Sequence, residues 1–163
     1  MKYLLDSNTF IEAKNTYYSM TICPGYWEWL LYSNKVHGVA SIEFVKAELE
    51  KKDDNLSEWI KSNTHIFLSE SDEETQKAFS EVANYIASLD FKDAVKADFL
   101  SGADPWLIAK AITAKSTIVT HEQFNPQCKR KILIPNVARH FNVQCIRTFE
   151  LLHNLEAKFV LQE

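Results

Sequence analysis

The sequence predicts an α/β protein with a parallel sheet and helices on both faces. Short apolar runs typical of buried strands recur along the chain, and segments with helical spacing of apolar residues separate them. The chain has 163 residues, of which 46% are hydrophobic and 25% charged, as in one globular domain. Its apolar runs are far shorter than the roughly 20 residues that a membrane span needs, so we expect no contact with a membrane.

The first half of the chain begins this alternation. KYLLD at 2–6 is a short apolar run that ends on an acid, which predicts a buried strand. The aromatic and apolar segment 23–32 contains Pro24 near its start, which predicts a helix. VHGVAS at 36–41 predicts a second strand. Apolar residues then follow helical spacing as far as residue 49, with Ser41 as the predicted N-cap.

The second half continues the same pattern. HIFL at 65–68 predicts a third strand. Residues 72–89 have acids in the first turn and apolar residues along one face, which predicts an amphipathic helix. The remaining predicted elements are a helix at 103–113, a strand at 116–120, a short helix from Pro135 and a strand at 143–148.

The N-terminal segment and the cysteines indicate the cellular compartment. Asp6 and Asn8 fall where a signal peptide needs an unbroken apolar stretch. Cys23, Cys128 and Cys145 are odd in number, widely spaced and without a CxxC pair, which is typical of reduced thiols. We therefore expect a cytoplasmic protein.

The charge is unevenly distributed along the chain. The formal net charge of −4 argues against a purely electrostatic nucleic-acid binder. Residues 123–149, however, contain no acid and five basic residues. Lys129, Arg130 and Lys131 form the densest part of this segment, and we interpret them as a patch that binds RNA phosphates. The alternative, a solvated surface without a ligand, stays open at this stage.

Two acids follow predicted strands directly. Asp6 ends the first strand, and Glu122 comes just after the fourth, two residues beyond Thr120. Ligands of open α/β sheets bind outside the carboxyl ends of the strands, so both acids are well placed for a site. For Asp6, the structural alternative is an N-cap for a following helix. His121 is more consistent with a local hydrogen-bond partner than with a metal ligand.

Two further acids lie on predicted helices. Glu48 borders the apolar face of its helix, and Glu43 and Glu50 are alternatives on the same helix. Asp104 precedes Pro105, and this pair also suits an N-cap followed by the first helical residue. The capping role and a role in a site both remain open for Asp104.

Together the four acids suggest one chemistry. Several carboxylates at one point cannot all stay ionised without a cation between them, and Mg²⁺ or Mn²⁺ takes oxygen ligands of this kind. Such ions activate water and stabilise charge on a phosphoryl group. The chain lacks a P-loop, a dinucleotide-binding glycine fingerprint and a GxSxG motif, and its histidines and cysteines show no zinc-ligand spacing.

The chain resembles the PIN-domain superfamily of metal-dependent ribonucleases over nearly its whole length. LLDSN at 4–8, VKAEL at 45–49 and ADPWLIAKA at 103–111 are similar to the segments that carry the first three acids of that superfamily. VTHEQF at 119–124 is similar to the Thr-x-Asp segment before the last acid. IPNVARHFNVQCIRTFELL at 134–152 resembles the C-terminal part of a stand-alone bacterial PIN-like group described only as a domain of unknown function.

The resemblance implies a fold and a site. The fold is a single PIN-like domain over 1–163, a three-layer α/β/α sandwich whose five parallel strands have the order 3-2-1-4-5. The implied catalytic and metal-binding residues for Mg²⁺ or Mn²⁺ are Asp6, Glu48, Asp104 and Glu122. Asn8 and Thr120 would support them. Glu122 stands where the superfamily usually has Asp, which places the fourth position in doubt.

The resemblance also implies a biological role, an endoribonuclease toxin of the VapC type that is held inactive by a cognate antitoxin, with a homodimer as the expected assembly. A structure-specific DNA nuclease of similar fold is a second hypothesis, although 163 residues leave little room for the added DNA-binding modules. A third is a catalytically silent PIN-like module that binds protein or RNA. Metal titration separates this third hypothesis from the other two.

Overall fold

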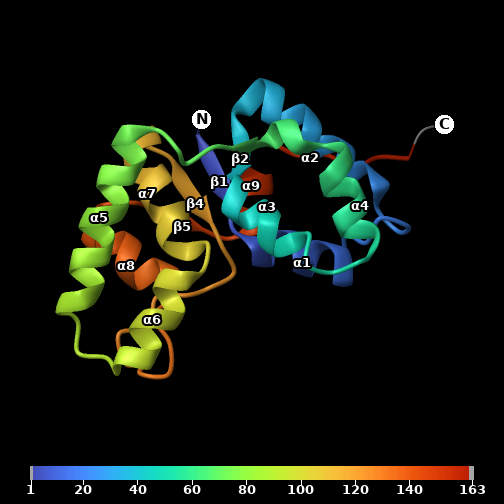
Figure 1. Ribbon diagram of the computed structural model, residues 1–163. Coiled ribbons are helices and arrows are strands. Elements are labelled where there is room, and N and C mark those ends of the chain that lie inside the picture. The colour runs from blue at the N-terminus through green and yellow to red at the C-terminus, as the bar shows by residue number, and fades with distance from the viewer. Residues whose placement is uncertain (1, 162–163) are drawn as a thin grey trace.

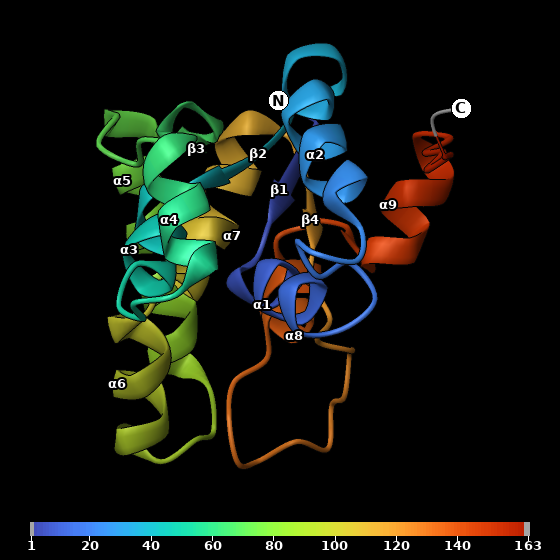
Figure 2. The same cartoon turned by 90° about the vertical axis from the view of Figure 1, so that its right-hand side faces the viewer.

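The computed structural model describes residues 2–161 and contains one five-stranded parallel sheet. The strand order is β3-β2-β1-β4-β5, and every pair of neighbours is parallel. Figure 2 shows β3, β2, β1 and β4 side by side in this order. The five strands are β1 Tyr3–Leu5, β2 Val39–Ile42, β3 Phe67–Leu68, β4 Thr117–Val119 and β5 Cys145–Ile146. The predicted α/β fold and its strand order are therefore confirmed.

Helices cover both faces of the sheet and make three layers (Figure 1). One face carries α5, α6, α7 and α8, and α7 contacts both β2 and β4. The other face carries α1, α2, α4 and α9, and α2 contacts β2. The helices are α1 Ser7–Asn15, α2 Pro24–His37, α3 Glu43–Leu49, α4 Asn55–Ser62, α5 Glu73–Ser88, α6 Asp93–Ser101, α7 Asp104–Ala114, α8 Ile134–His140 and α9 Thr148–Asn154, with a 3₁₀ turn η1 at Thr64–Ile66.

The strands are short but almost wholly buried. All four residues of β2 are buried, as are Leu4 and Leu5 of β1 and Ile118 and Val119 of β4. Burial on both faces explains why these segments are continuous apolar runs and do not alternate with polar residues. The core of the protein therefore lies along the central strands.

The point where the strand order reverses lies between β1 and β4. Leu5 pairs with Val119, and the backbone N–H of Asp6 donates to the Val119 carbonyl at 2.9 Å. The N–H of Thr120 donates to the carbonyl of Ile146 on β5 at 2.9 Å. The hydrogen bonding thus extends one residue past both central strands and places Asp6 beside Thr120 at the carboxyl edge of the sheet.

The long amphipathic helix predicted at 72–89 is confirmed as α5. Asp72 is its N-cap, and the Asp72 carboxylate accepts from the Thr75 N–H at 2.9 Å. Glu73 and Glu74 lie in the first turn, where the positive end of the helix dipole stabilises acidic side chains. The buried residues of α5 include Ala78, Val82 and Ile86, on the side that faces α7.

Two helix caps that the local sequence suggests, the predicted cap Ser41 and the alternative cap Asp104, each lie one residue away from the cap in the structure. Ser41 is not an N-cap, because it pairs with Phe67 within the sheet and its hydroxyl donates to the Leu5 carbonyl at 2.6 Å. Ile42 takes the N-cap position of α3 instead. Asp104 is the first residue of α7 and not its cap, which is Ala103. Ladder pairing and packing, which local patterns do not reveal, decide both boundaries.

Four helices have no counterpart among the predicted elements. They are only seven to nine residues long, and α6 buries a single residue, Phe99, so its apolar periodicity is weak. The predicted helix 23–32 extends to His37, where Gly38 ends it in the left-handed conformation. The unpredicted helices are α1, α4, α6 and α9. Within residues 2–161, no helix is both long and apolar enough to cross a membrane.

Gly38 offers a test of the junction between α2 and β2. Its φ of 69° favours glycine, and its carbonyl accepts from the N–H of Lys2 at 3.0 Å. We expect Gly38→Ala to cost about 1–2 kcal/mol of unfolding free energy, since a Cβ is strained in this conformation. The melting temperature should fall by about 2–8 °C in a thermal melt. Gly25→Ala is the control, because Gly25 is helical and its Cβ would meet Phe159 at an ordinary 3.8 Å. Equal melting temperatures for the two variants would contradict this account.

Candidate active site

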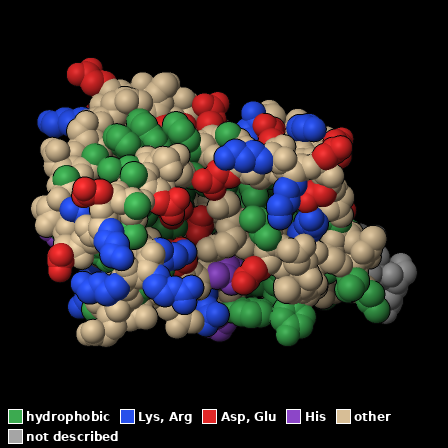
Figure 3. All heavy atoms as spheres, turned by 60° about the horizontal axis from the view of Figure 1, so that its bottom comes forward, with side chains coloured by type: hydrophobic (Ala, Val, Ile, Leu, Met, Phe, Trp, Pro, Cys, Tyr) green, Lys and Arg blue, Asp and Glu red, His purple; other side chains and the backbone are tan. Residues whose placement is uncertain are grey.

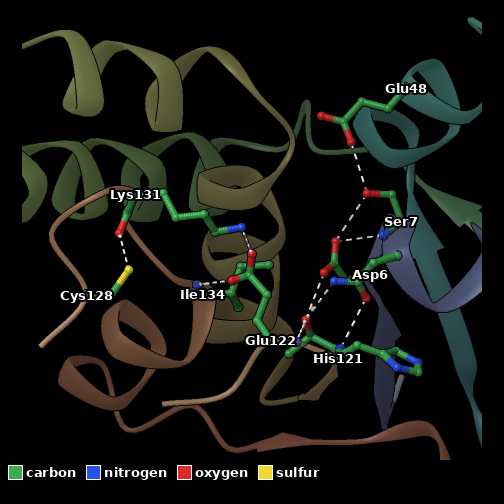
Figure 4. Close-up of polar contacts among 10 residues, drawn as sticks. Asp6, Ser7, Glu48, His121, Glu122, Cys128, Lys131 and Ile134 are labelled. Atoms are coloured by element: carbon green, nitrogen blue, oxygen red, sulfur yellow. Dashed lines mark hydrogen bonds and ion pairs between the residues drawn. The ribbon is translucent and has the colours of Figure 1, made fainter. Parts of the chain in front are cut away.

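Asp6 lies at the centre of a polar cluster beyond the carboxyl edge of the sheet (Figure 4). It is 3% exposed. One carboxylate oxygen accepts from the N–H of Ser7 at 2.7 Å, and the other accepts from the Thr120 hydroxyl at 2.8 Å. Asp6 is also the N-cap of α1, which confirms the capping role considered for it. The pKa of Asp6 is raised to about 6, first by burial and then by the charge of the nearby Glu122, although the hydrogen bond from Thr120 lowers it.

Glu48 projects from α3 toward the same point. Its Oε2 accepts from the Ser7 hydroxyl at 3.1 Å, and Ser7 in turn contacts Asp6 (Figure 4). Its Oε1 accepts from the backbone N–H of Ala103 at 3.0 Å. Glu48 therefore ties α3 to the residue that precedes α7, and this contact holds the start of α7 near Asp6.

Asp104 has the fewest stabilising partners of the four acids. Within residues 2–161, no hydrogen bond or ion pair reaches its carboxylate. The pKa of Asp104 is raised to about 8, mainly by burial and further by the charges of Asp6, Glu122 and Glu48. At neutral pH without a cation, Asp104 therefore holds a proton.

Glu122 has two protein donors for its carboxylate. The Lys131 ammonium donates to Oε1, and the backbone N–H of Ile134, the first residue of α8, donates to Oε2 at 2.7 Å (Figure 4). Burial lowers the pKa of Lys131, but its hydrogen bond to Glu122 and the negative charges of Glu122, Asp104 and Asp6 together outweigh burial, so the pKa rises. Glu122 therefore has a structural role, fastening the loop after β4 to α8.

Three polar residues hold the loop after β4. The Asn8 amide donates to the Thr120 hydroxyl at 3.3 Å and accepts from the His121 N–H at 3.1 Å. The His121 ring contacts Thr148 and pairs with Glu12, so the prediction of a local hydrogen-bond partner is confirmed. Asn8 and Thr120 thus occupy supporting positions next to Asp6.

We call Asp6, Glu48, Asp104 and Glu122 the acid cluster. A cleft of about 530 Å³ opens beside it. Glu48 and Asp104 line it, together with Phe44, Lys51 and Lys131. Figure 3 shows acidic side chains inside a hollow on the face toward which the strand ends point, with Lys and Arg side chains on both sides. The arrangement combines concentrated negative charge with a cationic rim.

The basic triplet does not act as one patch. Lys131 pairs with Glu122 and lines the cleft. Lys129 lies over the ring of Phe91, at 5.4 Å from the ring centroid. Arg130 is exposed. The three residues therefore differ in their surroundings, and binding of RNA phosphates by them stays a prediction.

The ligand types of the acid cluster suit a divalent cation better than the arrangement of its side chains does. Its donors are all carboxylate oxygens, the ligands of Mg²⁺ and Mn²⁺, and the unpaired Asp104 carboxylate lies among three like charges. In the part of the chain that the structure describes, no group of three or more His, Cys, Asp or Glu side chains is arranged to hold one metal ion. The cluster therefore supplies the charge and donors for a cation without closing around one.

Sequence reasoning identified all four acids but missed residues that connect them. Ser7 bridges Asp6 and Glu48 across 41 positions of sequence, and no local pattern announces this contact. The pairing of Lys131 with Glu122 was also missed, because Lys131 belongs to a run that reads as a surface patch. The one signal that could have indicated Ser7 is a hydroxyl residue directly after a strand-end acid.

Comparison with protein-family models gave one match, to the family described as "Domain of unknown function (DUF4411)", over residues 3–159. Searches of the curated proteins and of the solved structures gave no significant match.

The raised pKa of Asp104 predicts how stability depends on pH. Between pH 4 and pH 8, the unfolded chain releases this proton before the folded protein does, so the free energy of unfolding falls as pH rises. In the presence of EDTA, we expect Asp104→Asn to be more stable than wild type at pH 8 by roughly 2–4 kcal/mol, since each pKa unit is about 1.4 kcal/mol and partial exposure weakens the effect. The two proteins should have equal stability at pH 4.

Urea titrations at pH 4, 6 and 8 measure this difference. Asp98→Asn is the matched control, because Asp98 lines the same cleft but is exposed. This control should follow the wild-type pH dependence. Parallel pH profiles for wild type and Asp104→Asn would refute the electrostatic account of the cluster.

Proposed function

We propose that this chain, which belongs to the DUF4411 family, is a PIN-like metal-dependent endoribonuclease that hydrolyses RNA phosphodiester bonds. The observation that carries the proposal is the meeting of four carboxylates from four segments at the point where the strand order reverses. Besides burial, the charge of Glu122 raises the pKa of Asp6, and the charges of Asp6, Glu122 and Glu48 raise the pKa of Asp104. A fold without a ligand gains nothing from such crowding, because like charges in a partly buried site destabilise it.

Asp6 and Asp104 are the proposed cation ligands, with Glu48 and Glu122 completing the negative site. A bound Mg²⁺ or Mn²⁺ supplies an activated water and neutralises charge on the phosphoryl group. Ser7 and Thr120 orient the Asp6 carboxylate through hydrogen bonds at its two oxygens. The Ala103 N–H orients Glu48. These donors restrict the carboxylates before substrate arrives, which is what a site for in-line displacement requires.

The charges around the cluster suit a phosphodiester substrate. Lys51 and Lys131 line the cleft beside Glu48 and Asp104. Within residues 2–161, Lys51 takes part in no ion pair, so its ammonium is available to a phosphate. Lys129 and Arg130 are exposed and directly precede Lys131 in the sequence, and they extend the proposed contact with RNA.

The toxin role, the cognate antitoxin, the homodimer and action in the cytoplasm remain parts of this proposal that follow from the resemblance. Three free cysteines agree with a reducing compartment. An apolar groove between α2 and residues 158–161, with Tyr32 56% and Ile22 78% exposed, is the surface best suited to a protein partner. Trp27, by contrast, is buried in the core.

A catalytically silent PIN-like module is the second candidate function, and one observation favours it. Lys131 and the Ile134 N–H already satisfy Glu122, and no three acidic side chains among residues 2–161 are arranged around a common ion position. In this case the protein would bind RNA or protein without cleaving it. Calorimetric titration with Mg²⁺ and Mn²⁺ distinguishes the two functions, because the silent module binds neither ion.

Asp6→Asn tests the central ligand. Asn is also a good N-cap, so the start of α1 should persist, while the loss of the negative charge removes the main anionic ligand. We expect cleavage of a mixed RNA pool in Mg²⁺ or Mn²⁺ to fall by more than roughly 100-fold, beyond the effect of a residue that orients a ligand. Metal affinity measured by calorimetry should fall with it.

The controls for this test are EDTA, a DNA pool and Asp98→Asn, which removes an exposed carboxylate from the same cleft. EDTA should stop wild-type cleavage, and Asp98→Asn should cleave like wild type. Full activity of Asp6→Asn would exclude the proposed site. Cleavage of DNA in preference to RNA would support the DNA-nuclease hypothesis instead.

Glu122 tests how far the fourth acid takes part. Its carboxylate is held by Lys131 and by the Ile134 N–H, which suits a residue that shapes the site from its edge. Glu122→Gln keeps the shape and an acceptor for Ile134 but loses the ion pair. We therefore expect a loss of about 10–100-fold in cleavage rate. Glu122→Asp, with the residue type usual in the superfamily, should retain a substantial part of the activity.

Rates for both Glu122 variants across a Mg²⁺ and Mn²⁺ titration separate direct from indirect action. A direct ligand would shift the metal concentration needed for half-maximal rate by orders of magnitude. Wild-type rates and metal affinity in Glu122→Gln would remove Glu122 from the site.

A further inference from the structure

Three aromatic rings form a continuous stack next to the acid cluster. Phe44 and Trp106 have ring centroids 5.0 Å apart with planes inclined by 6°, and Trp106 and Phe79 have centroids 3.9 Å apart with planes inclined by 14°. The rings come from α3, α7 and α5, so the stack forms only in the folded protein. We call these residues the aromatic stack (Phe44, Trp106 and Phe79).

The stack is not part of the hydrophobic core. Trp106 packs against the core, whereas Phe44 and Phe79 belong neither to the core nor to the described side chains packed on it. Phe44 is 41% exposed. Parallel stacking of this kind leaves the outer face of the terminal ring open to a further flat group. Phe44 thus stacks on Trp106 on one side while a large part of its side chain remains exposed.

Phe44 is fixed in place and lines the catalytic cleft. Its backbone N–H donates to the Glu70 carboxylate at 2.9 Å, and Glu70 is 4% exposed, which anchors the first turn of α3. Glu48 follows Phe44 by four residues, about one turn, on the same helix α3. Phe44, Glu48 and Asp104 all line one cleft. A flat group on this ring would therefore lie beside the acid cluster.

The rest of the cleft indicates which flat group binds there. Lys131, which is paired with Glu122, and Lys51, which has no ion pair among residues 2–161, both line the same cleft, so Lys51 favours a ligand that combines a π-face with negative charge. Nucleotides of single-stranded nucleic acid have this combination, since their bases stack on aromatic side chains and their phosphates contact basic residues. The cleft volume of about 530 Å³ is within the usual range for a small-ligand site.

We infer that Phe44, backed by Trp106 and Phe79, binds one unpaired nucleobase of the RNA substrate and so positions the adjoining phosphate at the acid cluster. This inference rests on the proposed function for its substrate and names the part of the substrate that is recognised. It makes Phe44 a positioning residue, because it contacts a base and not the reacting phosphate. Single-stranded RNA is then bound in preference to duplex, whose paired bases have no exposed face.

The test measures binding without cleavage. Fluorescence anisotropy with short single-stranded RNA oligonucleotides in EDTA compares wild type with Phe44→Leu, which keeps an apolar side chain but loses the π-face. We expect Phe44→Leu to bind about tenfold more weakly, as base–aromatic stacking normally contributes, and Phe44→Trp to bind within about threefold of wild type. Phe149→Leu is the matched control, because Phe149 is 63% exposed on α9, on the opposite face of the sheet from α7 (Figures 1 and 2).

Oligonucleotides with one abasic position identify the stacked base. At one position, removal of the base should weaken binding to wild type but have little further effect on Phe44→Leu, since both changes remove the same contact. Unchanged affinity in Phe44→Leu, additive losses at every abasic position, or equal losses in Phe149→Leu would each overturn the inference. Absence of measurable binding by wild type would overturn it as well.

This outcome is separable from that of the proposed function. If wild type cleaves RNA and Phe44→Leu binds and cleaves like it, the nuclease proposal stands and the stacking inference fails. If wild type binds RNA through Phe44 but cleaves no RNA with either metal, the stacking site stands and the catalytic proposal fails. In an active enzyme, Phe44→Leu should raise KM about tenfold with little change in kcat at saturation.

Discussion

The hydrogen bond from Thr120 to Asp6 is the contact on which the site depends. It joins the ends of β1 and β4 where the strand order reverses, and it links two residues 114 positions apart. Asp6 also caps α1 and contacts Ser7, through which Glu48 is connected. Thr120 is held in turn by Asn8 and leads to Glu122. Through this one contact, the register of the central strands decides where three of the four acids lie.

The protein compensates its crowded acids unequally. Glu48 and Glu122 receive backbone N–H donors near the starts of α7 and α8, and Glu122 has a lysine as well. Asp6 receives three donor contacts from Ser7 and Thr120, whereas Asp104 has neither a hydrogen bond nor an ion pair within residues 2–161. Asp104, which lines the cleft, is thus the acid with the fewest stabilising partners. Its burial, and then the charges of Asp6, Glu122 and Glu48, favour its protonated form, which is the direction of its pKa shift.

The two proposals use different parts of the same cleft. In the first proposal the acid cluster acts on a phosphate, and in the second the aromatic stack, which joins α3 to α7 and α5, contacts a base. Both depend on the start of α3, since Phe44 and Glu48 belong to this one helix. The hydrogen bond from the Phe44 N–H to the buried Glu70 therefore anchors the first turn of the helix that carries both Phe44 and Glu48.

Local sequence pattern was sufficient for the alternation of strands and helices, for α5 with its acidic first turn, and for the strand-end positions of Asp6 and Glu122. These features depend on hydrophobic periodicity and on capping, which act over a few residues. The strand order came from a resemblance between whole motifs and was confirmed by the structure. The short helix α6 escaped prediction because it buries a single residue, Phe99, and so shows little apolar period.

Tertiary structure alone decided which groups meet. The contacts of Ser7 with Glu48, of Glu48 with the Ala103 N–H and of Phe44 with Trp106 join segments 41 to 62 residues apart, and each depends on how α3 and α7 pack on the sheet. Packing also placed Ser41 in a strand and removed Lys131 from the surface patch to pair with Glu122. The sequence by itself thus determined which acids stand at strand and helix ends. The fold determined which of these carboxylates receive hydrogen bonds or an ion pair and which remains open to a ligand. The reason is that the donor groups come from distant positions of the chain, which only folding brings together.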